Sequence, residues 1–511
     1  MKVRKTTMKL FYFCLLSLCG FAESSRILLV FSSFSPSHFI LGNALGRGLA
    51  NGGHQVTVVS PFEDKNPPKN YRNVVLTGFT DKQKGNHPKF FDMENMHPWL
   101  GLFVLNSMGK TLAEETLKHP TFRALLNEQF DLIVLDQFRS DALRALSCHF
   151  DAPLIMFSTI GANSWVNVDV ANPSPPSYVP AVFLGYSSKM DLWQRTFNFL
   201  TYNFAEINDH FLYRPVQREL IKTYLPKCGD FDLHNVSLYF LNSHESYSEA
   251  IPLVPNTINV GGYHIQPPKN LTGDLKAFLD SAKDGVVYFS LGSNIKPSEM
   301  KPEIREAVVK SLGKLKQKVL WKYDGDELPG KPDNVKLGKW LPQTDILAHP
   351  NIKVFITHGG LLSSLETIYH GVPILAIPVF GDQKLNAARA EKLGYGLKLS
   401  YSEITESSLS EALDKLLYDP KYRDNAKMRS KLSHDRPMKP MDLILYWTDY
   451  VVRHKGADHL MVAGVNLPWY QYLILDVVLL LIVLTLVPLI VLYLVCRRLC
   501  CSRTSSKKKK E

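Results

Sequence analysis

Cysteine is scarce in this sequence, which limits the covalent and metal-based ways of holding the fold together. The 511 residues include seven cysteines. Five lie in the terminal segments described below: Cys14, Cys19, Cys496, Cys500 and Cys501. Cys148 and Cys228 remain in the body of the chain and could form one disulfide, although the sequence leaves their pairing open. Two cysteines do not make a disulfide framework, and no metal-ligand spacing occurs among the seven.

The body of the chain also lacks an excess of charge. The formal net charge is +11, but eleven basic residues lie at the two ends, together with one acidic residue, Glu511. The basic residues are Lys2, Arg4, Lys5, Lys9, Arg497, Arg498, Arg503 and Lys507 to Lys510. A nucleic-acid-binding protein would carry its positive charge on the folded domain, so nucleic acid is excluded as a partner. The content of 45% hydrophobic and 21% charged residues is typical of a globular protein.

The N-terminal basic residues precede a short apolar run over residues 10–22. Gly20 and Ala22 occupy suitable −3 and −1 positions for cleavage, so we expect a secretory signal peptide over residues 1–22. An uncleaved anchor is the alternative, but the run is too short to span a bilayer easily.

A second apolar run, over residues 477–495, is long enough to cross a membrane and carries no charge. Aromatic residues at its start are typical of a membrane interface, and we predict a transmembrane helix over residues 472–496. The basic tail, residues 497–511, should remain cytoplasmic by the positive-inside rule. The expected topology is therefore a single-pass type I membrane protein with a lumenal body.

Two short motifs indicate the compartment. Lys508 and Lys509 lie four and three residues from the C-terminus, which matches a dilysine retrieval signal and predicts residence in the endoplasmic reticulum membrane. A stop-transfer charge cluster is the alternative interpretation of the same lysines, and both can hold. Asn235 and Asn270 lie in Asn-X-Ser/Thr sequons and are candidate glycosylation sites.

The body itself repeats one pattern of alternating strands and helices. The first series begins with apolar strands at residues 26–31 and 55–60, joined by a helix. After a stretch rich in glycine and proline at residues 259–273, which we interpret as a linker, the series restarts at residue 285. Strand–helix–strand alternation predicts parallel sheets with right-handed crossovers. We therefore expect two doubly wound α/β domains, over residues 23–262 and 263–465.

Two regions are less regular. Residues 160–250 are rich in aromatic residues and broken by prolines, so they could line an apolar pocket or only fill a core. Residues 410–465 are expected to be helical, with breaks at Pro437 and Pro440.

The stretch from Phe355 to Gln383 carries more polar groups than packing requires. His358, Gly359 and Gly360 form a strand-to-helix turn, and the N–H groups at a helix start suit an anion such as a diphosphate. Ser363 can add a hydroxyl group, and Glu366 could accept from paired sugar hydroxyls. An ordinary capped helix is the alternative explanation of the turn by itself.

The longer segment, Trp340 to Ala387, resembles the donor-binding signature of UDP-dependent glycosyltransferases over its whole length, and the resemblance extends through both halves of the chain. It implies a GT-B fold, in which two Rossmann-like domains face each other, and a UDP-sugar as donor. The donor-binding residues that it implies are Ser293, Trp340, Gln343, His358, Gly360, Ser363, Glu366, Asp382 and Gln383.

The resemblance also implies their roles. Trp340 stacks on the uracil, Gln343 lies beside the nucleotide and Glu366 binds the ribose hydroxyls. Ser293, His358 and Ser363 hold the diphosphate, with Gly360 in the turn, while Asp382 and Gln383 bind the hydroxyls of the transferred sugar. Leu362 departs from the pattern, because many relatives carry asparagine there.

The N-terminal half is expected to supply the catalytic base. His38 follows the first strand, and Asp136 ends the strand at residues 130–136, so both should lie at one edge of the sheet. A histidine oriented by a buried carboxylate is a general base, and the family's catalytic pair matches these two positions. Asp141 is the alternative carboxylate, whereas His54 is interpreted as a structural residue.

Together these features predict inverting transfer of a hexosyl group, with glucose as the first choice, from a UDP-sugar to a hydroxyl of a small lipophilic acceptor. Glucuronate as the sugar and a lipid or protein as the acceptor are alternatives, and a catalytically silent binding protein of the same fold is a further one. The resemblance implies no cofactor beyond the UDP-sugar co-substrate and no required metal. Assembly into a homo-oligomer is left open.

Overall fold

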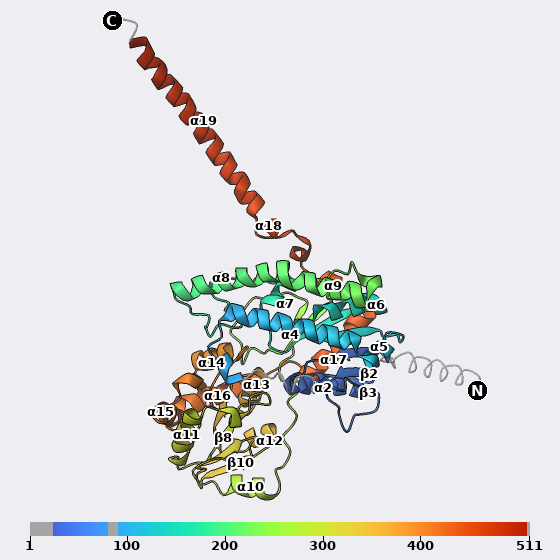
Figure 1. Cartoon of the computed structure of the whole chain (residues 1–511), viewed down its shortest axis with the longest axis vertical. Coiled ribbons are helices and arrows are strands. Elements are labelled where there is room, and N and C mark those ends of the chain that lie inside the picture. Colours follow the sequence, from blue (N-terminus) through green and yellow to red (C-terminus); the bar gives the residue numbers. More distant parts are fainter. Residues whose placement is uncertain (1–23, 80–89, 508–511) are drawn as a thin grey trace, which may run out of the picture. The chain divides into compact units, whose positions relative to one another are not determined.

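The computed structural model describes residues 24–79 and 90–507 (Figure 1). The expected signal peptide and the two lysines of the retrieval signal, Lys508 and Lys509, lie outside these residues. Internal contacts divide the chain into two units, one ending at Leu460 and one beginning at Met461. The first unit contains both sheets, and the second contains the long apolar helix.

Within the described residues, the N-terminal domain is built on a sheet of seven parallel strands in the order β3-β2-β1-β4-β5-β6-β7. The strands are β1 (Arg26–Val30), β2 (Gln55–Ser60), β3 (Tyr71–Val75), β4 (Leu132–Asp136), β5 (Leu154–Ser158), β6 (Leu238–Leu241) and β7 (Thr257–Asn259). The central strands are buried along their whole length, as expected for parallel strands covered on both faces. The strand order reverses between β1 and β4, and the open edge at such a switch point is where α/β sheets bind ligands.

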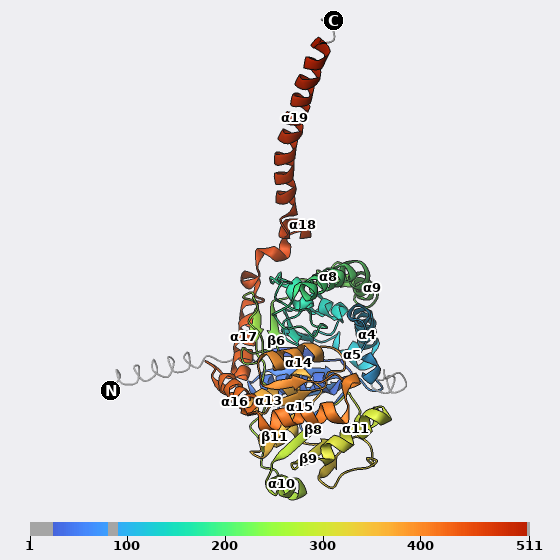
Figure 2. The same ribbon diagram turned by 90° about the vertical axis from the view of Figure 1, so that its left-hand side faces the viewer.

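A second parallel sheet, in the order β10-β9-β8-β11-β12-β13, forms the C-terminal domain. Its strands are β8 (Val286–Ser290), β9 (Lys318–Lys322), β10 (Val335–Gly338), β11 (Ile352–Thr357), β12 (Ile374–Ala376) and β13 (Gly396–Lys398). Here the order reverses between β8 and β11. The predicted fold class, two doubly wound α/β domains, is confirmed (Figure 2).

Helices flank both sheets, and several begin with proline in the first turn, where its missing N–H costs nothing. Those of the N-terminal domain are α2 (Pro36–Asn51), α4 (Pro98–Lys118), α5 (Pro120–Leu125), α6 (Leu146–Phe150), α7 (Ser164–Asp169), α8 (Leu192–Asn208) and α9 (Arg214–Tyr224). Those that follow are α10 (Gly273–Asp280), α11 (Pro302–Gly313), α12 (Gln343–Leu347), α13 (Leu361–His370), α14 (Gln383–Lys392), α15 (Glu406–Tyr418), α16 (Pro420–His434) and α17 (Pro440–His454). The irregular region 160–250 thus contains α7, α8, α9 and β6.

Two segments pack on the domain to which they do not belong by sequence. Helix α17 lies in the range that we expected for the C-terminal domain, but its Ile444 and Val451 are buried in the core of the N-terminal sheet, against α2. In the opposite direction, the turn η1 (Phe90–Met93) buries Phe91 in the C-terminal core, where its ring stacks on Tyr401 with 4.3 Å between centroids. This exchange holds the two domains together.

Cys148 and Cys228 form a disulfide across 80 residues of chain, which answers the question that the sequence left open. Cys148 lies in α6, and Cys228 lies in the turn after α9. The bond therefore ties the irregular region to the first sheet. Cys496 is a free, exposed cysteine.

The second unit contains two short helical turns, η8 (Ala463–Asn466) and α18 (Trp469–Tyr472), and the long helix α19 (Leu475–Lys507). Residues Leu475–Leu499 of α19 have a mean hydropathy of 3.2 and are long and apolar enough to cross a membrane. This range overlaps the predicted span of residues 472–496.

We expect Cys148→Ser to lower the stability of the protein by about 2–5 kcal/mol, because the disulfide closes a long loop and restricts the unfolded chain. Thermal unfolding of the full chain, followed with and without reductant, measures the loss. The matched control is Cys496→Ser, which removes an unpaired thiol and should leave the midpoint unchanged. Equal midpoints for the two variants would contradict a stabilising role of the disulfide.

Candidate active site

A cavity of about 740 Å³ lies between the two domains and is lined by residues from both. Its size lies within the usual range of ligand sites. The segments that follow β1, β8 and β11 contribute His38, Ser293 and His358 to its lining, with His38 in the first turn of α2. The switch points of the two sheets therefore open into the same cavity.

His38 and Asp136, the predicted catalytic pair, are in contact. The Nδ1 atom of His38, in the first turn of α2, lies 2.6 Å from Oδ2 of Asp136, at the end of β4. The carboxylate is almost fully buried, and the edge of Phe138 packs against the imidazole with 4.8 Å between centroids. If Nδ1 donates to the carboxylate, Nε2 is left as the acceptor, and His38 is one of the residues that line the cavity.

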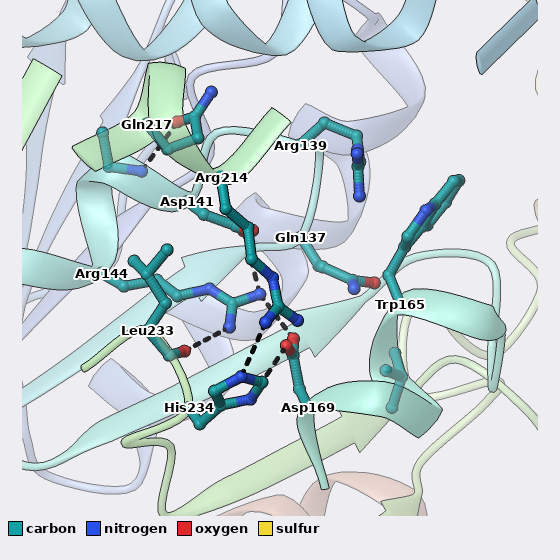
Figure 3. A network of polar contacts seen from close by, with 12 residues as sticks. Gln137, Arg139, Asp141, Arg144, Trp165, Asp169, Arg214, Gln217, Leu233 and His234 are labelled. Atoms are coloured by element: carbon teal, nitrogen blue, oxygen red, sulfur yellow. Dashed lines mark hydrogen bonds and ion pairs between the residues drawn. The ribbon is translucent and has the colours of Figure 1, made fainter. Parts of the chain in front are cut away.

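Asp141, the alternative carboxylate, takes part in a different network (Figure 3). Its Oδ1 lies 2.9 Å from the guanidinium of Arg144, which also contacts Asp169 at 2.7 Å. Arg144 is buried, and it donates to the carbonyl oxygen of Leu233. These contacts link the irregular region to the loop after β4, which is a structural role. His54 is also structural, since it is buried at the end of α2 beside Asp449 of α17.

On the donor side, three predicted residues are hydrogen-bonded to one another. The amide nitrogen of Gln343 donates to the Ser363 hydroxyl at 3.0 Å and to the Glu366 carboxylate. Thr344, which we did not predict, donates to the second oxygen of Glu366. Burial raises the pKa of Glu366, and the two hydrogen bonds partly offset this effect. The carboxylate is thus held in one orientation at the cavity wall, as a group that binds vicinal hydroxyls needs to be.

His358 is enclosed by two glycines. A Cβ atom at Gly292, whose φ is +81°, or at Gly360 would overlap the imidazole ring, so both positions must lack a side chain. Burial, with a smaller effect of the Lys322 ammonium, lowers the pKa of His358 to about 4. The ring is therefore neutral near pH 7 and can meet an anion only by donating an N–H. Gly360 itself caps α13, whose first N–H groups begin at Leu361.

Asp382 and Gln383 stand at the start of α14 and line the cavity. Asp382 accepts from the Asn386 amide at 2.6 Å, and burial raises its pKa. The side-chain oxygen of Gln383 accepts from the N–H groups of Val379 and Phe380, so its amide nitrogen is the part that remains for a ligand.

Several residues of the cavity wall were not predicted. The ammonium of Lys322, at the end of β9, lies 4.5 Å above the exposed ring of Trp340 and donates to the Gly292 carbonyl. Asn294 donates to the Ser35 hydroxyl at 2.9 Å and so bridges the domains beside the catalytic pair. Neither residue has a distinctive local pattern. Lys322 ends a strand, and Asn294 follows the Ser-Leu-Gly-Ser turn. Their place at the cavity depends on contacts with distant segments, which the sequence around them does not show.

His264 was also missed. It lies in the predicted linker, it lines the cavity, and its two ring nitrogens have no hydrogen-bond partner within the described part of the chain. Burial lowers its pKa to about 4. Leu362, where relatives often carry asparagine, packs against the core of the N-terminal sheet and makes an apolar contact between the domains.

One side of the cavity, expected to hold the acceptor, is apolar. Its lining includes Phe34, Ile40, Val104, Leu105, Met108, Phe138, Ile160, Trp165 and Phe183. The irregular region therefore does both things that we considered, because three of these residues come from it while others, such as Val166 and Leu220, fill the core. Asn235 and Asn270 of the two sequons are exposed. Within the described residues, no three His, Cys, Asp or Glu side chains gather as a metal site.

The contact of His38 with a buried carboxylate, and the polar groups around Glu366 and His358 that line the same cavity from the other domain, suit the class of nucleotide-sugar-dependent glycosyltransferases. The family model "UDP-glucoronosyl and UDP-glucosyl transferase" matches residues 50–511. A UDP-glycosyltransferase of Dactylopius coccus, UGT5, is 38% identical over 92% of this chain and 91% of its own length. Human UDP-glucuronosyltransferase 1A7 is 32% identical, over 91% of this chain and 90% of its own.

Solved structures agree on the fold. The glycotransferase of kitacinnamycin superposes with a TM-score of 0.56 at 19% identity, over 82% of this chain and 98% of its own. The chain belongs to the UDP-glucuronosyl and UDP-glucosyl transferase family, and it is a UDP-glycosyltransferase.

We expect His38→Ala to lower kcat by about 10²- to 10⁴-fold, because no other group would take the proton of the acceptor. Asp136→Asn should lose on the order of 10²-fold or more, since the amide does not hold the imidazole in the required tautomer. Calorimetry should show unchanged UDP affinity in both variants. The matched control is Asp141→Asn, which should lower stability but change kcat only a few-fold. Near-normal turnover of His38→Ala would show that His38 is not the catalytic base.

The lowered pKa of His358 predicts a loss of stability in acid. Between pH 6.5 and about 4 the unfolded chain protonates this histidine and the native protein does not, so unfolding takes up a proton and stability falls as the pH falls. One such group contributes a slope of up to about 1.4 kcal/mol per pH unit. The midpoint of thermal unfolding, measured from pH 7 to pH 4.5, should fall less steeply in His358→Gln. Identical slopes would contradict a neutral, buried His358.

Proposed function

We propose that this UDP-glycosyltransferase transfers glucose with inversion from UDP-glucose to a hydroxyl group of a small lipophilic molecule. The observation that carries the proposal is the cavity itself. His38, which Asp136 holds from behind, and the polar groups around Glu366 and His358 line it from opposite domains, next to an apolar wall. An acceptor with an apolar body and one hydroxyl matches this division.

The mechanism follows from the positions of these groups. Nε2 of His38 takes the proton of the acceptor hydroxyl, and the charge of Asp136 stabilises the imidazolium that forms. The acceptor oxygen attacks the anomeric carbon as the bond from that carbon to the diphosphate oxygen breaks, and UDP leaves with the bonding electrons. An α-linked donor therefore gives a β-glycoside.

Uncharged hydrogen-bond donors are available for the negative charge that develops on the diphosphate. The first N–H groups of α13, the hydroxyl groups of Ser293 and Ser363 and the imidazole N–H of His358 lie at the cavity wall. Donors that are fixed before the reaction stabilise the leaving group without reorganisation. Trp340 would stack on the uracil and Glu366 would bind the ribose.

The sugar is assigned to glucose because the residues next to its expected position suit hydroxyl groups. Asp382 offers a carboxylate, and Gln383 offers an amide nitrogen. Lys384, the neighbouring cation on α14, donates to the carbonyl oxygen of Glu94 instead and so ties the two domains. Glucuronate, the donor sugar in the name of the human relative, would need a cation for its carboxylate and is the second candidate.

We further propose residence in the membrane of the endoplasmic reticulum, with the first unit lumenal and the tail cytoplasmic. The excess of basic residues after Leu499 and the lysines Lys508 and Lys509 support this orientation and address.

Incubating membranes that contain the protein with a panel of phenols and UDP-sugars tests both parts of the proposal. We expect mass spectrometry to detect a hexoside from UDP-glucose, with the β-configuration by NMR. Lys384→Met should retain transfer from UDP-glucose. If the protein instead used UDP-glucuronate, the same substitution should abolish formation of the glucuronide.

A separate experiment tests the lumenal placement. In sealed vesicles with the lumen inside, activity should be latent until detergent is added, because a nucleotide sugar does not cross a bilayer unaided. Activity without detergent would overturn the lumenal placement.

A further inference from the structure

Arg139 follows Asp136 by three residues and has a backbone conformation that is uncommon for a residue with a side chain. Its φ is +58°, in the left-handed region. Its carbonyl oxygen also lies against α4, where a Cβ atom at Gly109 would overlap it, so that position of the helix must lack a side chain. A conformation of this kind persists only where the surrounding contacts enforce it, and such residues cluster at functional sites.

The guanidinium of Arg139 has partners at its edge and on its faces. Its two terminal nitrogens donate to the two carboxylate oxygens of Asp209, one of them at 2.8 Å. Nε and Nη2 also donate to Oδ1 of Asn106, at 3.1 and 2.7 Å. The ring centroid of Tyr213 lies 3.5 Å from Cζ and that of Trp165 lies 5.1 Å from it (Figure 3). A planar, forked cation is needed to make all these contacts together.

Two of these partners belong to one irregular turn. Asp209 and Tyr213 are the first and last residues of η3 (Asp209–Tyr213), a single π-helical turn between α8 and α9. Such turns are rare and are frequent at functional sites. The hydroxyl of Tyr213 also accepts from the N–H of Asp141 at 3.2 Å. The turn therefore holds the loop after β4 at two points, residues 139 and 141.

The same loop reaches the catalytic pair through Phe138. The residue before it, Gln137, still donates its N–H to a carbonyl oxygen of β5 at 2.9 Å, and the residue after it is Arg139. Phe138 thus lies between two fixed residues. Its ring meets the imidazole of His38 edge-on, with 4.8 Å between centroids and 81° between the planes. The imidazole is therefore held between this ring and the carboxylate of Asp136.

We propose that Arg139 is a positioning residue for the catalytic base. Held by Asp209, it fixes Phe138 against His38 and so keeps Nδ1 of the imidazole on the carboxylate of Asp136. Because Asp209 already balances the charge of the buried guanidinium, Arg139 is not assigned to the acceptor itself. The inference rests on the proposed function in one respect, the role of His38 as the base, and it is independent of which sugar and which acceptor the protein uses.

The first test uses Arg139→Lys in the full chain. Lysine keeps a positive charge beside Asp209 but loses the planar fork and the contact with Asn106. We expect the single-turnover rate, measured with the UDP-sugar that gives the highest turnover, to fall on the order of 10- to 100-fold, because a small displacement of a reacting group has an effect of this size. UDP affinity, measured by calorimetry, should not change, since the donor groups lie in the other domain. An unchanged rate would overturn the proposal.

Arg144→Lys is the matched control. Arg144 is equally buried and also pairs with two carboxylates, but it has no contact with Phe138 or with the catalytic pair. Both variants should lower the midpoint of thermal unfolding, whereas Arg144→Lys should change the rate only a few-fold. Equal losses of rate in the two would overturn the proposal, because the loss would then follow stability. If Arg139→Lys does not fold, Arg139→Met combined with Asp209→Leu removes both charges, a replacement that buried pairs often tolerate, and carries the same expectation.

A double-mutant cycle with His38→Ala separates positioning from a purely structural role. If Arg139 acts through His38, adding Arg139→Lys to His38→Ala should not lower the residual rate any further. A loss by the same factor as in the otherwise unchanged chain would refute the proposal. Near-normal turnover of His38→Ala itself would refute the proposed base, and this inference with it, so failure of the proposed function is distinguishable from failure of the positioning role alone.

Discussion

Two segments cross between the domains in opposite directions, and the site depends on both. Phe91 is buried in the C-terminal core and Ile444 in the N-terminal core. Each half of the cavity is carried by its own sheet, so His38 and the polar groups around Glu366 can contact the same ligand only if the two sheets keep a constant separation. An exchange of buried apolar side chains fixes that separation more firmly than surface contacts do, because pulling either segment away exposes a core residue to water. Smaller contacts, such as the hydrogen bond from Asn294 to Ser35, then connect the two domains next to the cavity.

Burial controls the chemistry of the cavity. It makes His358 neutral and raises the pKa of Glu366 and Asp382, in each case because a charge is less stable away from water. The carboxylates remain useful because neighbouring side chains hold them, Gln343 and Thr344 for Glu366 and Asn386 for Asp382. A ligand in the cavity would thus meet side chains that are already oriented, and few of them would need to be ordered on binding.

Helix α8 is fixed on the N-terminal domain by polar and aromatic contacts. Its polar side is fixed inward by Asn198, and its apolar side faces out. The same helix packs through Phe204 on α4, which lines the acceptor cavity with Val104 and Leu105.

The sequence by itself determined the class of fold and the identity of the family. Short runs of Val, Ile and Leu between helical segments predict buried parallel strands, and the segment from Trp340 to Ala387 carries its donor chemistry in consecutive residues. His38 and Asp136 could be paired in advance because parallel strands bring their carboxyl ends to one edge. Local patterns were sufficient to predict the features that depend on residues close together in the chain.

Only the tertiary structure decided the contacts between distant segments. The short strands β3, β6, β7 and β10 have weak patterns and are defined by the partners beside them. Cys148 meets Cys228 across 80 residues, and α17 packs on the first sheet instead of the second. In each case the position that wins is the one that buries most apolar surface and pairs most polar groups over the whole molecule. A short stretch of sequence does not contain the long-range contacts that determine this total burial and pairing. For this reason Lys322, Asn294 and His264 could be placed at the cavity only after the fold was known.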